Sequence, residues 1–131
     1  MRAAISMAIL PVLLAVAAGT PAQPYPAKPI RIVVPFPSGS GADVMARSVG
    51  TKLAERWGQQ VIADARPGAS GVIAADLVLQ APADGYTLML GTSSSHAANV
   101  STRRNLSYDP VRDFSPVSLI ARVPMLVLAH P

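Results

Sequence analysis

The chain has 131 residues, which is enough for one folded domain and too few for two. Half of the residues are hydrophobic and 14% are charged, which excludes a charge-rich disordered chain, and the absence of cysteine excludes a disulfide framework and a cysteine-ligated metal site. The net charge is +4, and the basic residues are scattered singly along the chain, which argues against nucleic-acid binding. The exception is Arg103 and Arg104, which we predict to be a solvated surface pair.

Residues 1–22 have the pattern of an export signal. An uncharged apolar run over residues 3–18 follows a basic start, and small residues then lead to a predicted cleavage after Ala22, with cuts a few residues earlier as alternatives. The run is interrupted by a proline and is shorter than the roughly 20 apolar residues that span a membrane, although an uncleaved anchor stays open. We expect a cleaved signal peptide and an exported mature chain of residues 23–131.

Beyond a proline-rich arm at residues 21–29, the sequence predicts alternating strands and helices. Residues 30–34 are β-branched and nearly all apolar, which is typical of a strand buried on both faces of a parallel sheet. A helix is predicted over residues 43–57, with an apolar face at positions 44, 45, 49, 53 and 57. Asp43 is suited to be its N-cap or a first-turn residue, and Gly58 its C-cap. The other predicted elements are a strand at 60–63, a helix at 72–80, a strand at 86–90, a short helix at 97–102 and strands at 117–121 and 125–129. This alternation predicts an α/β fold with a parallel βαβ sheet.

Glycine- and serine-rich loops follow the first and third predicted strands. In open parallel sheets, ligands bind beyond the carboxyl ends of the strands, so both loops are candidates for a binding site. Residues 38–42 can turn backbone amides and two hydroxyls toward one point at a helix N-terminus, where the helix dipole favours an anion. Residues 92–96 add four hydroxyls and an imidazole. We therefore predict an anion cradle without a cation, the alternative being that these serines only cap helices.

Other chemistries fit the sequence less well. The first loop imitates a dinucleotide-binding turn, but Val44 stands where the third glycine belongs, and no Gly-Lys-Ser/Thr follows to make a P-loop. Ser95 and His96 are neighbours in sequence, which does not place their side chains together, and no nucleophile elbow surrounds a serine. With His130 the chain has only two histidines. We expect no catalytic residue, no cofactor and no metal site.

Several motifs together resemble one protein family. They are VVPFPSGSGAD at residues 33–43, RPGASG at 66–71, DGYTL at 84–88, LSYDP at 106–110, and Asp113 with Phe114. In this order and spacing the chain resembles the Bug proteins, the periplasmic solute-binding components of tripartite tricarboxylate transporters.

The resemblance implies a function, a location and a site. It implies a two-lobed periplasmic clamshell that closes on a small carboxylated solute and delivers it to a membrane permease, with no nucleic-acid partner and a monomeric state if complete. It also implies that the loops matching residues 36–43 and 92–96 act as pincers on the solute. The predicted site residues are Phe36, Ser38, Gly39, Ser40, Gly41, Asp43, Thr92, Ser93, Ser94, Ser95 and His96.

The length departs from the family pattern. Members are usually more than twice as long, so we expect residues 23–131 to form part of the first lobe, ending near the crossover, with the second lobe absent. Because closure of two lobes buries the ligand, a single incomplete lobe should bind weakly. A truncated remnant without transport activity, or one with another role, therefore stays open as the alternative.

Overall fold

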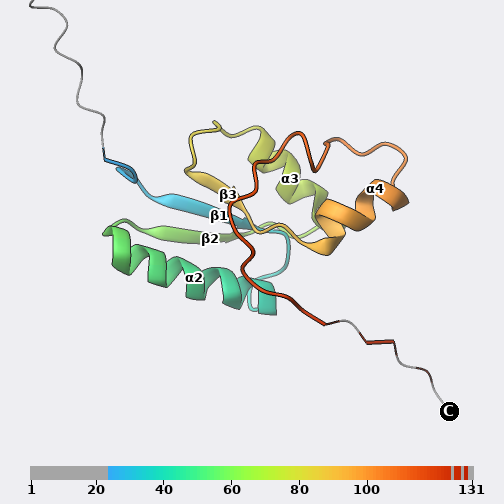
Figure 1. Ribbon diagram of the computed structural model, residues 1–131, viewed down its shortest axis with the longest axis horizontal. Helices are drawn as coiled ribbons and strands as arrows, with labels where there is room; N and C mark the ends of the chain where they lie inside the picture. Colours follow the sequence, from blue (N-terminus) through green and yellow to red (C-terminus); the bar gives the residue numbers. More distant parts are fainter. Residues whose placement is uncertain (1–23, 125, 128, 130–131) are drawn as a thin grey trace, which may run out of the picture.

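The structure is a computed structural model that describes residues 24–124, 126, 127 and 129 (Figure 1). The predicted signal peptide, residues 1–22, lies outside these residues. Within them, a three-stranded parallel sheet has the order β2-β1-β3, with β1 (Ile30–Val34) between β2 (Val61–Ala65) and β3 (Thr87–Met89). The predicted α/β class with a parallel sheet is confirmed.

Two helices connect the strands and cover opposite faces of the sheet (Figure 1). Helix α2 (Gly41–Trp57) leads from β1 to β2, and helix α3 (Val72–Leu79) leads from β2 to β3. The chain continues through a π-helical turn, η3 (Ser94–Ala98), into the short helix α4 (Asn99–Thr102). Because the three strands are parallel, the loops that follow them lie together at the carboxyl end of the sheet.

The central strand is buried, as its apolar sequence predicts. Ile32 and Val34 pack with Ala46 of α2 and with Leu90, which follows β3. Side chains alternate along a strand, so Val33 points to the opposite face, and it is fully buried there. Helix α3 covers that face (Figure 1). A strand that is covered on both faces must be apolar throughout, because neither face meets water.

Helix α2 packs through a different set of residues than the sequence predicts. Ser40 caps its N-terminus and Gly58 ends it in the left-handed conformation, as the pattern suggested for Gly58. Val44 was placed on the apolar face but is 56% exposed, whereas Ala46 and Gly50 are buried. A Cβ on Gly50 would lie 3.2 Å from the Val61 side chain, so small residues let the helix approach β2 closely.

The end of the chain departs from the predicted strands. Residues 117–121 form neither helix nor strand, and Val117 and Leu119 are largely exposed. The prediction of a strand there is wrong because a strand needs a hydrogen-bonded neighbour, and none of the three described strands pairs with this segment. The strand predicted over 125–129 includes positions outside the described residues; 126, 127 and 129 are in no strand.

Among the described residues, no helix is both long enough and apolar enough to span a bilayer.

Candidate functional site

The loops that follow the three strands meet at Gly71. This glycine is buried with φ +91°, and a Cβ built on it would lie 3.0 Å from Ser95 Cβ and 3.3 Å from Pro35 Cβ. Pro35 follows β1, Gly71 belongs to the loop after β2, and Ser95 belongs to the loop after β3. The fold thus brings the two predicted loops together, and it adds a third, residues 66–71, between them.

The first loop is organised around the carboxylate of Asp43. The Oδ2 atom accepts hydrogen bonds from the Gly39 amide and from Arg47 Nε, both at 2.9 Å. The Asp43 amide donates to Ser40 Oγ at 3.3 Å. Ser40 is therefore the N-cap and Asp43 a first-turn residue, one of the two roles that the sequence suggested for Asp43.

The first loop is followed by one cation, Arg47, which is committed to Asp43. Arg47 lies one helical turn after Asp43 and forms an ion pair with it. The Arg47 hydrogen bond first, and the Gly39 amide second, hold the pKa of Asp43 below 3.8, against the opposing effect of burial. The Gly39 amide is consequently occupied, and Asp43 Oδ1 is buried without a partner among the described residues.

Several donors of the first loop remain available to a ligand. The amides of Gly41 and Ala42 are the first two of α2 and form no hydrogen bond with the described part of the chain. The side chain of Ser38 is likewise uncommitted there, and the Ser40 hydroxyl accepts one bond while keeping its own proton. These groups can still hold an anion at the N-terminus of a long helix.

The third loop is a network of hydroxyls centred on Ser95. Ser95 Oγ lies 3.1 Å from both the Thr92 amide and Thr92 Oγ1, and 2.8 Å from His96 Nδ1. The sequence predicts a loop over residues 92–96. In the structure, however, Ser94, Ser95 and His96 lie in the π-helical turn η3. The side chains of Ser95 and His96, which adjacency in sequence does not by itself bring together, are in contact in this turn.

The Ser95–His96 contact does not have the properties of a hydrolytic pair. Ser95 is fully buried, and its hydroxyl oxygen accepts from the Thr92 amide. No carboxylate of the described chain orients His96, which packs edge-on against Phe114 with ring centroids 5.0 Å apart. Burial lowers the pKa of His96 below 6.5, so the imidazole is neutral at pH 7.

The predicted site residues divide by exposure. Buried members are Asp43 and Ser95; partly buried members are Ser40, Thr92, Ser94 and His96; exposed members are Phe36, Ser38, Gly39, Gly41 and Ser93. The two buried residues are engaged in internal hydrogen bonds, so they support the loops. The exposed and partly buried members are the ones that can reach a ligand.

Three residues that organise the site were missed by the sequence-based reasoning. Asn99 is 2% exposed and donates from Nδ2 to the Ser70 carbonyl at 3.1 Å. Tyr108 is also buried, and its hydroxyl donates to the Ser95 carbonyl. Arg103, predicted to be solvated, donates from Nη2 to the Ala69 carbonyl at 3.0 Å. The nearest signal in the sequence was the LSYDP motif, which contributed to the family resemblance and gave Tyr108 no role in the site.

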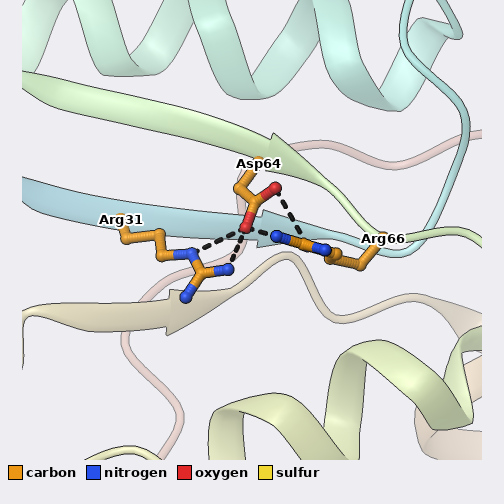
Figure 2. Close-up of polar contacts among 3 residues, drawn as sticks. All are labelled: Arg31, Asp64 and Arg66. Atoms are coloured by element: carbon orange, nitrogen blue, oxygen red, sulfur yellow. Dashed lines mark hydrogen bonds and ion pairs between the residues drawn. The ribbon is translucent and has the colours of Figure 1, made fainter.

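A second charged group links β1 to β2. Figure 2 shows the Asp64 carboxylate between the guanidinium groups of Arg31 and Arg66, with Arg31 Nε at 2.7 Å and Arg66 Nε at 3.1 Å. Burial by itself raises the pKa of Asp64, but the hydrogen bonds and charges of Arg31 and Arg66 outweigh it and leave the pKa below 3.8. Asp64 is thus committed to two arginines.

The described residues contain no group of three or more His, Cys, Asp or Glu that could hold a metal ion.

Comparison with known proteins gives a consistent result. The family described as "Tripartite tricarboxylate transporter family receptor" matches residues 45–131. BugT of Bordetella pertussis is 41% identical over 117 residues, which are 88% of this chain and 36% of BugT.

Two solved structures from Rhodopseudomonas palustris show the same likeness. MatC with bound malate is 36% identical with a TM-score of 0.70, over 73% of this chain and 33% of MatC. A protein solved with adipate is 44% identical with a TM-score of 0.64, over 66% of this chain and 29% of its own. The chain thus spans about a third of the length of the relatives it matches.

Proposed function

Because the chain belongs to the tripartite tricarboxylate transporter receptor family, we propose that it captures a small carboxylated solute in the periplasm and delivers it to the transporter's membrane permease. The family consists of transport receptors and not of enzymes. We further propose that the exported receptor acts as a monomer.

The meeting of the strand-end loops at Gly71 carries this proposal. It puts Pro35, which begins the loop that leads to α2, on one side of Gly71 and Ser95 of η3 on the other. Amides at a helix N-terminus and uncommitted hydroxyls are suited to a carboxylate, which needs several hydrogen-bond donors at once.

The solute class follows from the same groups and from the relatives. MatC was solved with malate and the second R. palustris protein with adipate, and both ligands are dicarboxylates. The first loop already contains the neutralised pair of Asp43 and Arg47, so the solute's charge is met by dipoles and hydroxyls. Such a site is expected to bind reversibly, as a transport receptor must.

A binding experiment tests the proposal. The whole protein, as its gene encodes it, is titrated calorimetrically with malate, adipate and a panel of other carboxylates, and we expect saturable binding of at least one. The double variant Ser93→Ala with Ser94→Ala should weaken that binding, because these hydroxyls form no hydrogen bond with the described chain. Ser48→Ala, an exposed serine of α2, is the matched control and should bind as the wild type does.

The same titrations can contradict the proposal. If the folded whole protein binds no member of the panel, the proposal is wrong, and the alternative of a chain without transport activity becomes the better account. Equal binding by the wild type and the double variant would instead remove the η3 hydroxyls from the site.

A further inference from the structure

The second loop holds an unusual backbone conformation. Ala69 and Ser70 have φ values of 48° and 56°, and Gly71 follows at 91°. Residues with a Cβ rarely adopt positive φ, so this conformation is strained unless its surroundings hold it. The Ala69–Gly71 turn therefore needs contacts that fix it.

The residues of α4 and its C-terminus supply those contacts. Asn99 Nδ2 donates to the Ser70 carbonyl at 3.1 Å, and Arg103 Nη2 donates to the Ala69 carbonyl at 3.0 Å. Arg103 Nε also donates to Asn99 Oδ1 at 3.3 Å, so the two side chains act as one unit. Two carbonyls of the strained turn, those of Ala69 and Ser70, are thereby held by one pair of side chains.

The same unit reaches the third loop through Tyr108. Asn99 Nδ2 lies 3.3 Å from the Tyr108 hydroxyl, which in turn donates to the Ser95 carbonyl. The chain of contacts runs from the second loop to the loop that contains the proposed solute ligands. Asn99 and Tyr108 are both buried, so water does not compete for these bonds.

We propose that the Ala69–Gly71 turn is a third wall of the solute site, and that Arg103 is the residue that positions it. The inference rests on the proposed function. The turn lies between the first and third loops at Gly71, and Ser70 is exposed with a hydroxyl that forms no hydrogen bond to the described residues. A carboxylate held between the first and third loops would contact this turn.

The chain contains a matched control for Arg103. Arg104 is the next residue, carries the same charge and is also exposed, but it forms no hydrogen bond or ion pair with the described residues. A charge effect would affect both arginines alike. A positioning effect belongs to Arg103 alone, because only its planar fork reaches the Ala69 carbonyl and Asn99 together.

The experiment compares Arg103→Met and Arg104→Met in the whole protein, with malate and adipate as probes. Binding is measured by calorimetry, and the backbone amide resonances of Ala69–Gly71 are followed by NMR. We expect Arg103→Met to weaken binding about tenfold and to shift these resonances in the unliganded protein, with the melting temperature close to that of the wild type. Arg104→Met should change neither, Arg103→Lys should recover part of the affinity, and solute should move the Ser70 amide resonance in the wild type.

Any of four results would overturn the inference. If solute binds the wild type without moving the Ala69–Gly71 resonances, the turn is no wall of the site, although the proposed function stands. If Arg103→Met binds like the wild type, or if both methionine variants weaken binding equally, Arg103 is not a positioning residue. If the wild type binds no probe in the carboxylate panel, the proposed function fails and this inference fails with it.

Discussion

At the scale of single residues, Asp43 is a tightly constrained member of the candidate site. Its carboxylate is nearly inaccessible and is shared between a backbone amide and Arg47. Its pKa lies below 3.8, so the folded chain binds fewer protons at this group than the unfolded chain does. Stability from Asp43 is therefore present above pH 3.8 and is lost as the pH falls through the folded-state pKa.

Substitution by the isosteric amide tests this pH dependence. Asp43→Asn should lower the melting temperature at pH 7, because Arg47 loses its charged partner, and the difference from the wild type should shrink as the pH falls below 3.8. Thermal melts recorded from pH 7 to pH 3 measure it. Glu55→Gln, in the exposed pair with Lys52, is the control and should change little at any pH. A difference that persists unchanged at pH 3 would show that the Asp43 charge is not its source.

At the scale of elements, the ends of α2 are specified by their caps. Ser40 has an extended backbone and accepts from the Asp43 amide, and Gly58 takes the left-handed conformation at the other end. These two residues set the limits of the helix. They also set where the uncommitted amides of the candidate site begin.

The cap predicts a specific loss of stability. Ser40→Ala should reduce the free energy of unfolding by about 1 kcal/mol, since the helix loses its N-cap acceptor, whereas Ser40→Gly should cost only a few tenths. Ser38→Ala, two residues earlier and without a hydrogen bond to the described chain, should be neutral. Urea denaturation followed by circular dichroism measures all three. A loss for Ser38→Ala equal to that for Ser40→Ala would argue against the cap.

At the scale of the whole molecule, stability comes from the sheet and its two helices. Ile32 is 6% exposed in the core against α2, whereas Leu119 is 70% exposed in the apolar segment that follows the fold. Both are large aliphatic residues in apolar runs of the sequence. Their environments in the folded chain are opposite.

This contrast gives a prediction for the 131-residue chain. Ile32→Ala should cost about 2–5 kcal/mol in the free energy of unfolding, because it leaves a cavity in the core. Leu119→Ser should change it by no more than about 0.5 kcal/mol, because the side chain is mostly solvated. Equilibrium urea unfolding compares the two. A cost for Leu119→Ser as large as that for Ile32→Ala would mean that this segment packs in solution.

The sequence by itself determined the α/β class, the central strand and most helix limits. Residues 30–34 were predicted as the strand that the structure contains, and Gly58 was predicted as the C-cap of α2. Both signals are local: a run of β-branched residues and a glycine after an amphipathic stretch act over one element. The motifs that resemble the Bug proteins are also local, and the match to the tripartite tricarboxylate transporter receptor family confirms that resemblance.

Only the tertiary structure decided which side chains become partners. Asn99 meets Ser70 across 29 positions of sequence, and Arg31 meets Asp64 across 33. It also decided that Ser95 contacts His96 and that residues 117–121 form no strand, since both depend on turn geometry or on a neighbouring strand. Periodicity and propensity describe how a segment behaves alone, whereas hydrogen-bond partners and strand pairing are set by the packing of segments that are distant in sequence.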